Sequence, residues 1–302
     1  MSVPYGIVLG CPRSGTTYLM SVLNSIPTLE ALSGTLLPVA IPHVVNQDLE
    51  SDVYDALAVG FERALDAYLH SGRYYSRAAA VQKWLRAPSG ISNLVRASKG
   101  QRVLPERMIY KEPFLSFAPQ FVRDAFPDAP IVHIVRDGRD CANSLVQSYD
   151  VLSDERLTHL RGSEMRLGRP FDERYVPWWV EKGHDLEFIE AMPYVRAIWM
   201  WKAMVGRCRE AFGTDGQKTN GQVLVLKYED FMHDPVKYGH RVLAHFGATP
   251  TAAFDKRLNA ARTSSIGKYR MRAEEEIVAA EQVASVELQK YGYALSTVAV
   301  TS

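Results

Sequence analysis

The stretch GCPRSGTT (residues 10–17) decides the fold class of this chain. It follows an apolar run, residues 5–9, that reads as a buried strand, and it precedes apolar residues at helical spacing over 18–26. A strand, a loop bounded by glycines and a helix, in this order, have the form of a phosphate loop, G-x-x-x-x-G-K-[ST]. In such a loop the backbone N–H groups at the start of the helix bind an anion. The stretch therefore predicts an anion site at one edge of a sheet.

One position departs from the nucleotide-binding form of this loop. Thr16 stands where a Lys would reach the β- and γ-phosphates of ATP. Arg13 supplies the positive charge inside the loop instead, and its planar guanidinium suits a tetrahedral oxyanion. Because a nucleoside triphosphate normally needs Mg²⁺ and the loop Lys, the sequence favours a ligand with a shorter anionic tail.

The rest of the chain predicts an α/β fold. Short apolar stretches at 108–110, 131–135 and 223–227 read as further buried strands of a parallel sheet covered on both faces. Helical patterns lie between the strands and after the last of them, at 61–69, 119–126, 138–149, 194–212, 235–246 and 272–290. Residues 150–193 have no clean period and mix charges, Gly and Pro with aromatic side chains. They are either a helical or irregular insertion that caps a substrate or a surface excursion.

Composition excludes several classes of protein. The 302 residues suit a single domain over 1–302, and 35 basic against 34 acidic side chains give a net charge of +1, which draws the chain to neither nucleic acid nor membrane. Three Cys are too few for a disulfide framework, and the His and Cys residues show no metal-ligand spacing. There is no apolar run long enough for a membrane span and no basic start typical of a secretory signal. We expect a cytoplasmic protein without a metal, and its oligomeric state is open.

A second candidate anion site follows the predicted strand at 131–135. Arg136 stands at the end of this strand, and Ser144 lies eight residues later, in the second turn of the next predicted helix. The two side chains can converge on one phosphate in that arrangement. Taken alone, an R-x₇-S spacing is a weak pattern, and its structural alternative is that Arg136 pairs with a nearby Asp while Ser144 is an ordinary helix residue.

The segment PRSGTTYL (residues 12–19) resembles the 5′-phosphosulfate-binding loop of sulfotransferases that use 3′-phosphoadenosine 5′-phosphosulfate (PAPS). The form is similar to that of tyrosylprotein sulfotransferases and related bacterial enzymes, and the R-x₇-S pattern resembles the family's 3′-phosphate motif. The resemblance implies a P-loop-type parallel sheet flanked by helices, PAPS as the sulfuryl donor and adenosine 3′,5′-bisphosphate (PAP) as the product. The donor-binding residues that it implies are Arg13, Ser14, Gly15, Thr16, Thr17, Arg136 and Ser144.

Three further segments carry weaker parts of the resemblance: residues 110–114, 225–230 and 262–268. In the family, the first holds a Lys at the transferring group, the second a Tyr near the adenine, and the third a loop that contacts phosphate or sulfonate oxygens. A Tyr packed at a strand end and a flexible polar loop are the structural alternatives for the last two. The additional site residues implied are Lys111, Tyr228, Ser265, Gly267 and Lys268.

Sulfuryl transfer depends on positioning and on cations at the leaving oxygen, so Lys111 and Arg13 are the expected catalytic cations. The acceptor hydroxyl also needs a general base. Residues 32–36 hold no carboxylate where the tyrosylprotein enzymes place a Glu, and residues 111–113 lack the His of the small-molecule enzymes. Two replacements stay open, His43 and Glu112, and each has a structural alternative: His43 as a structural His, Glu112 as an ion-pair partner of Lys111.

The sequence thus predicts a sulfotransferase that moves a sulfuryl group in line from PAPS to a hydroxyl of a small molecule, a glycan or a lipid. Two alternatives come from other classes of protein. A P-loop kinase or NTPase would need the loop Lys that is missing here, and a non-catalytic PAP- or nucleotide-binding protein would fit the missing family base. The aromatic side chains of 150–193 could stack on a phenol, a sugar or a polyketide chain.

Overall fold

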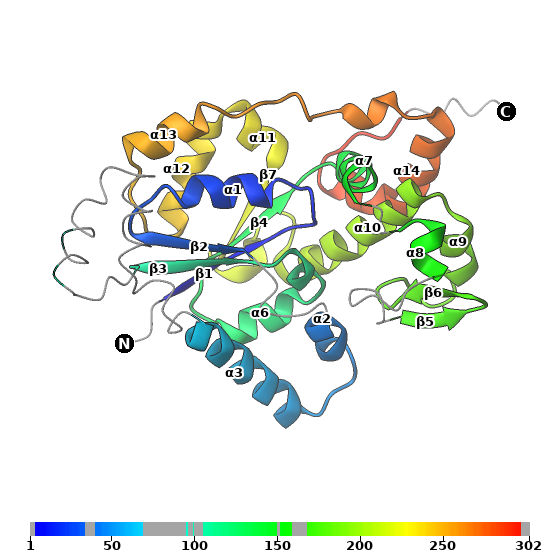
Figure 1. Cartoon of the computed structure of the whole chain (residues 1–302), viewed down its shortest axis with the longest axis horizontal. Coiled ribbons are helices and arrows are strands. Elements are labelled where there is room, and N and C mark those ends of the chain that lie inside the picture. The colour runs from blue at the N-terminus through cyan, green and yellow to red at the C-terminus, as the bar shows by residue number, and fades with distance from the viewer. Residues whose placement is uncertain are drawn as a thin grey trace.

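A parallel sheet of five strands forms the centre of the computed structural model, which describes residues 4–33, 40–68, 95, 99, 105–149, 152–158 and 168–296. The strands lie in the order β2-β3-β1-β4-β7 (Figure 1). Their bounds are β1 (Tyr5–Leu9), β2 (Leu29–Ser33), β3 (Arg107–Lys111), β4 (Ile131–Val135) and β7 (Val223–Lys227). Because all neighbours are parallel, the carboxyl ends of the strands meet at one edge, which is where ligands of such sheets bind.

Helices cover both faces of this sheet (Figure 1). In β1, Ile7 and Leu9 point into one core and Val8 into the other, as the alternation of side chains along a strand requires. Burial on both faces explains why the strands read as unbroken apolar runs. The helices of the first face are α3 (Ser51–Tyr68), α6 (Pro119–Ala125) and part of α10 (Pro193–Phe212). Those of the second face are α1 (Thr16–Leu23), α11 (Tyr228–His233), α12 (Pro235–His245) and α13 (Ala252–Leu258).

A third core lies beside the sheet, where α7 (Gly138–Ser148) and α14 (Glu274–Lys290) pack on α10 (Figure 1). The described part of the aperiodic segment 150–193 packs here too. It forms short elements: α8 (Asp154–Thr158), the antiparallel hairpin β5 (Gly168–Phe171) with β6 (Arg174–Pro177), and α9 (Asp185–Glu190). Buried Arg196 of α10 fastens this segment by donating to the carbonyls of Leu152 (2.9 Å) and Phe188 (3.0 Å).

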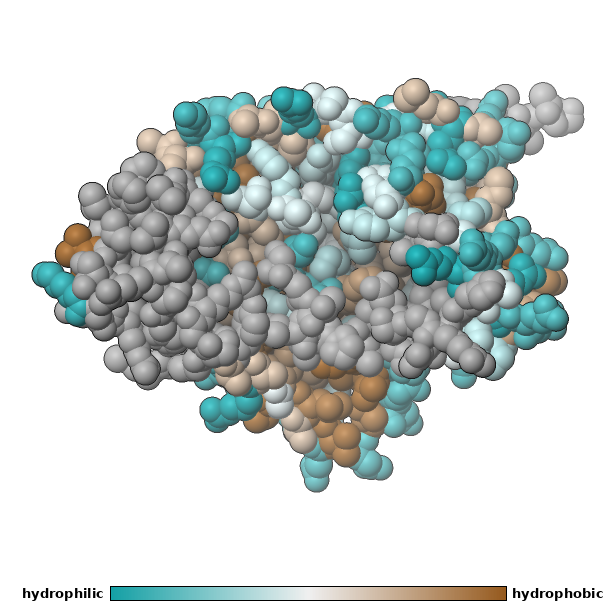
Figure 2. Space-filling view, viewed as in Figure 1, coloured by the Kyte–Doolittle hydropathy of each residue, from teal (hydrophilic) through white to brown (hydrophobic). Residues whose placement is uncertain are grey.

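The remaining elements are short. They are α2 (Ala40–Val45) and the 3₁₀ turns η3 (Pro113–Phe117), η4 (Gln217–Thr219) and η5 (Lys268–Met271). Helix α3 buries Phe61 and Leu65 against the sheet, whereas Val53 and Val59 are exposed on it. Figure 2 shows apolar surface gathered on the lower part of this view, where Figure 1 places α3. No helix within the described ranges is long and apolar enough to cross a membrane.

The predicted α/β class with a central parallel sheet is confirmed, and all four predicted strands are present. The edge strand β2 was not expected. Its sequence, LEALS, has no β-branched residue and includes Glu30, so it lacks the apolar signature of the inner strands. A strand at the edge of a sheet is paired on one side only, which relaxes the demand for such a signature.

Candidate active site at the carboxyl edge of the sheet

The loop between β1 and α1 has the shape expected of an anion-binding loop, and its two glycines are required by that shape. Gly10 has a φ of +151°, and a Cβ there would lie 2.5 Å from the carbonyl oxygen of Ile134. Gly15 has a φ of +99°, and a Cβ there would lie 2.4 Å from the ring of Tyr228. A side chain fits at neither place, so the glycine spacing in the sequence reflects close approach of β4 and Tyr228 to the loop.

The phosphate loop offers hydrogen-bond donors to an anion, and no acidic side chain in the first turn of α1 would repel that anion. The first turn of α1 holds no acidic residue. Ser14 is buried, and its Oγ has no hydrogen-bond partner in the part of the chain that the structure describes. A buried hydroxyl without a partner costs free energy, and an oxyanion held at the start of α1 would satisfy it. The loop therefore fits the anionic end of a ligand.

Arg13 connects the two anion sites that the sequence predicted separately. It has a φ of +72°, and its Nε donates to the Oγ of Ser144 over 2.9 Å. Its carbonyl oxygen accepts from Nη1 of Arg136 over 2.9 Å. Arg13 of the loop thus contacts two other predicted site residues, one at the end of β4 and one in α7.

Arg136 is held in place on several sides. Its Nη2 donates to the carbonyl of Ser265 over 2.5 Å, and its guanidinium lies 4.7 Å from the ring centroid of Tyr228. Asp140, one helical turn later, lies 3.6 Å from Nη2. The side chain is almost fully buried, and its Nε has no partner among the described residues. A buried cation with an unused donor is suited to bind an anion such as a phosphate.

The segment 263–269, which we call the late loop, contacts this cation. The hydroxyl of Tyr228 lies 2.9 Å from the Oγ of Ser265, and the backbone N–H of Gly267 donates to Asp140 over 2.6 Å. Lys268 is exposed at the end of the loop. The structure therefore brings Tyr228 and Ser265 to Arg136, and Gly267 to the neighbouring Asp140. Tyr228 packs between Gly15 and Arg136, that is, between the two predicted phosphate sites.

Lys111 lies at the same edge, at the end of β3. It pairs in register with Val8 of β1, and its Nζ donates to the Oγ1 of Thr17 over 3.3 Å. Burial lowers the pKa of Lys111, and the neighbouring carboxylate of Glu112 opposes that shift. Thr17 itself is exposed at the start of α1, so Lys111 reaches the first turn of the helix that carries the phosphate loop.

The two candidate bases have different surroundings. Glu112 is buried, and its carboxylate caps the turn η3 by accepting from the backbone N–H of Phe114 over 3.3 Å. His43 lies in α2, and the centroid of its ring is 5.4 Å from that of Trp178. Burial lowers the pKa of His43, which favours the neutral imidazole that can accept a proton. Of residues 32–36, the stretch without a carboxylate, positions 34–36 lie outside the described residues.

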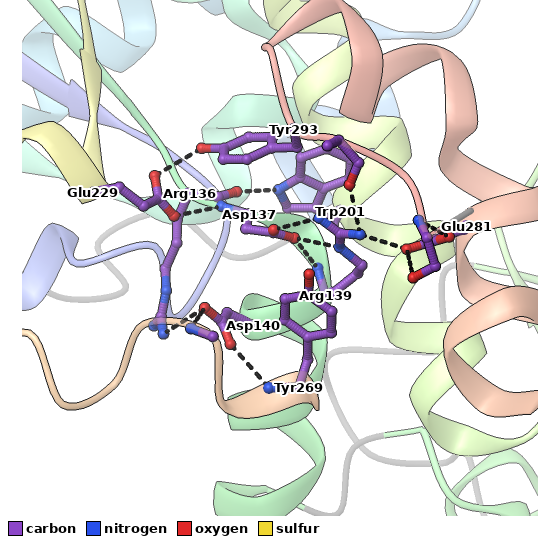
Figure 3. Close-up of polar contacts among 12 residues, drawn as sticks. Arg136, Asp137, Arg139, Asp140, Trp201, Glu229, Tyr269, Glu281 and Tyr293 are labelled. Atoms are coloured by element: carbon purple, nitrogen blue, oxygen red, sulfur yellow. Dashed lines mark hydrogen bonds and ion pairs between the residues drawn. The ribbon is translucent and has the colours of Figure 1, made fainter. Parts of the chain in front are cut away.

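Behind Arg136, a polar network not foreseen from the sequence fixes the backbone (Figure 3). The N–H of Asp137 donates to Glu229 over 3.0 Å, and the hydroxyl of Tyr293 donates to the same carboxylate over 2.9 Å. Trp201 donates from Nε1 to the carbonyl of Arg136 over 3.1 Å. The one feature of the sequence that could have indicated this network is the run of four charged residues in RDGRD (136–140), directly after a buried strand.

The same network continues into α14. Asp137 caps α7 by accepting from the N–H of Arg139 over 3.0 Å and also pairs with the guanidinium of that residue. Arg139 pairs with Glu281 of α14 as well (Figure 3). The described residues contain no cluster of His, Cys, Asp and Glu that could hold a metal ion.

Comparisons with known proteins show which proteins the chain resembles. No curated protein matches the sequence. Among solved structures, the sulfotransferase domain of the Synechococcus PCC 7002 olefin synthase is 16% identical with a TM-score of 0.50, over 97% of this chain and 96% of that chain. A sulfotransferase from Alicyclobacillus acidocaldarius is 18% identical with a TM-score of 0.47, over 96% and 95%. Mouse sulfotransferase SULT7A1 complexed with PAP is 13% identical with a TM-score of 0.44, over 96% and 86%.

The first of these similarities supports the fold that the strand order already shows. The sequence itself matches the model of the sulfotransferase family over residues 4–169, which is more than half of the chain and includes the phosphate loop, Lys111, Arg136 and Ser144. The prediction made from these motifs is confirmed: the chain belongs to the sulfotransferase family and is an enzyme of sulfuryl transfer.

Proposed function

We propose that the sulfuryl donor of this enzyme is PAPS and that the acceptor is a hydroxyl of a small molecule, a glycan or a lipid. The observation that carries the donor assignment is the junction of two anion sites through the Arg13–Ser144 contact. A ligand with a phosphosulfate at one end and a phosphate at the other matches two such sites. A ligand with one anionic tail would leave one of them unused.

The residues divide between the two ends of the donor. Around the 5′ end, the phosphate loop offers the backbone N–H groups at the start of α1, the hydroxyls of Thr16 and Thr17, and the unpartnered Oγ of Ser14. At the 3′ end, Arg136 offers its unused Nε–H and Ser144 its hydroxyl. Tyr228 and Ser265 support the 3′ site by packing against Arg136.

When bound, the donor supplies an activated sulfuryl group whose leaving oxygen gains negative charge as the S–O bond breaks. We assign Lys111 and Arg13 to stabilise this charge, because Lys111 contacts Thr17 at the start of α1 and Arg13 belongs to the phosphate loop. Cations and hydrogen-bond donors placed in advance where charge develops lower the barrier without reorganisation. The contact of Lys111 with Thr17 fixes the amine beside the loop. We assign Lys111 the larger share because it is partly withdrawn from water, whereas Arg13 is exposed.

We assign the general base to His43 in preference to Glu112. The carboxylate of Glu112 is buried and already engaged as a cap, so taking a proton there would disturb the turn η3. His43 is partly exposed and has a pKa below its ordinary value. A neutral imidazole near neutral pH is suited to receive the proton of an attacking hydroxyl.

Aromatic side chains near His43 suit an acceptor with an apolar part or a ring. Trp178 lies beside His43, and its ring centroid is 5.3 Å from that of Phe117. Trp178 belongs to the segment 150–193, whose described part packs beside α10.

Three expectations stay predictions: that the segment 150–193 caps the acceptor, that residues 1–302 form one domain, and that the protein is cytoplasmic.

Binding of PAP without a divalent metal tests the donor assignment. At 100 times its dissociation constant, PAP should add about 2.7 kcal/mol to the free energy of unfolding. ATP with Mg²⁺ is the control ligand, because it carries a triphosphate and lacks the 3′-phosphate. Stabilisation by ATP with Mg²⁺ and none by PAP would refute the assignment.

A second experiment identifies the class of acceptor. It measures turnover of PAPS with a panel of phenols, sugars and lipid alcohols.

A further inference from the structure

Asp140 fastens the late loop to the first turn of α7 (Figure 3). Its Oδ2 accepts from the backbone N–H of Gly267 over 2.6 Å, and its Oδ1 accepts from the N–H of Tyr269 over 3.1 Å. Both oxygens of one carboxylate thus hold a segment that lies more than 120 residues later in the chain. The late loop carries Ser265 and Lys268.

The same carboxylate faces the buried cation of the proposed 3′-phosphate site. Asp140 lies 3.6 Å from Nη2 of Arg136, and both side chains are almost fully buried. Nη2 also donates to the carbonyl of Ser265 in the late loop. Asp140, Arg136 and the late loop therefore form a closed triangle, in which each member is bonded to the other two.

Local electrostatics favours a carboxylate at this position. Asp140 is an acidic residue in the first turn of α7, where the helix dipole stabilises negative charge. A carboxylate can accept both loop N–H groups at once and still neutralise a guanidinium, whereas an amide offers one acceptor oxygen and no charge. A carboxylate at position 140 therefore suits the two loop N–H groups and the guanidinium of Arg136.

We propose that Asp140 is a positioning residue of the donor site, which holds the late loop closed and sets the orientation of Arg136 toward the 3′-phosphate. This inference rests on the proposed donor. Asp140 touches no reacting atom and acts through Arg136 and Ser265. Without it, Arg136 loses its charged neighbour, and the loop has to be ordered when the ligand binds.

The test compares Asp140→Asn and Asp140→Ala with the wild-type protein by isothermal titration with PAP and with adenosine 5′-monophosphate (AMP), which lacks the 3′-phosphate. PAP affinity should fall about 10- to 100-fold, the range expected for losing charge-assisted hydrogen bonds, with Asn less affected than Ala. AMP affinity should fall much less. Amide hydrogen exchange should rise at Gly267 and Tyr269 while the strands keep their protection.

Asp234 provides a matched control. It also accepts a backbone N–H, that of Lys237 over 3.2 Å, but it is the N-cap of α12 and not a partner of the late loop. Asp234→Ala should leave PAP affinity within about twofold of wild type, because it removes the same kind of bond outside the site.

Two results would overturn the inference: unchanged PAP affinity in both Asp140 variants, or equal losses for PAP and AMP. If Asp140→Ala does not fold, the nearly isosteric Asp140→Asn still decides between these outcomes. A wild-type protein that does not bind PAP would instead refute the donor assignment. In that case the exchange at Gly267 and Tyr269 alone would decide whether Asp140 holds the loop, and unchanged exchange would overturn that part as well.

Discussion

Replacing Lys111 with Ala should separate catalysis from donor binding. The amine lies at the end of β3, within 3.3 Å of Thr17, and it faces the loop proposed to hold the phosphosulfate. Charge on the leaving oxygen is larger in the transition state than in the ground state, so loss of the amine acts on turnover. Loss of one such donor costs about 10²–10³ in kcat, or about 2.7–4 kcal/mol. PAP affinity should change little, because PAP has no transferring group.

The assay measures single-turnover rates of PAPS consumption, PAP affinity and unfolding on the same preparations. Lys111→Met, which keeps the length of the side chain, controls for lost packing and should be as slow as Lys111→Ala. A structural role, through pairing with Glu112, predicts the opposite pattern: lower stability and a normal rate per folded molecule. A rate within about threefold of wild type in both variants would refute the catalytic role of Lys111.

The pH dependence provides a further check on Lys111. Burial lowers its pKa from the ordinary 10.5. The protonated amine is the form that stabilises the leaving oxygen, so the rate should fall as pH rises through this lowered pKa. The alkaline limb of the rate profile should therefore lie below pH 10.5. In Lys111→Arg the guanidinium stays charged, and this limb should disappear.

Three further predictions concern other side chains. Arg136→Ala should weaken PAP by about 1.5–3 kcal/mol and AMP much less, and equal losses measured by titration would contradict its assignment to the 3′-phosphate. His43→Gln should lower turnover about 10²- to 10⁴-fold at unchanged PAP affinity, and a normal rate in the variant would move the role of base to Glu112. The wild-type rate should fall as pH drops through the lowered pKa of His43, because the neutral form is the base. Burial lowers the pKa of His133 to about 3, so below pH 6.5 the unfolded chain binds a proton that the folded protein does not bind. The free energy of unfolding, measured by denaturant titration, should therefore drop by about 2 kcal/mol from pH 7 to pH 5, and by less in His133→Phe.

Features encoded within a few neighbouring residues could be predicted from the sequence. The strand, glycine spacing and helix start around residues 5–23 are such features, and so is the strand before Arg136. Short elements escaped prediction. The hairpin of β5 and β6 and the helices α8 and α9 have four to six residues each, too few to display a period. They are stable because Arg196 and the third core hold them, which is a tertiary effect.

The sequence by itself determined the class of fold and the family, and it supplied most of the residues that we propose to bind the donor, because glycine conformation, helix starts and strand burial are local demands on residue type. Only the tertiary structure decided how these residues meet. Arg13 and Ser144 are 131 positions apart in the chain, and Asp140 is 127 positions from Gly267. In a parallel sheet, neighbouring strands are joined by long crossovers, so residues that share an edge are distant in sequence. Contacts such as these, and the place of His43 beside Trp178, follow from the order of the strands and the packing of helices on them.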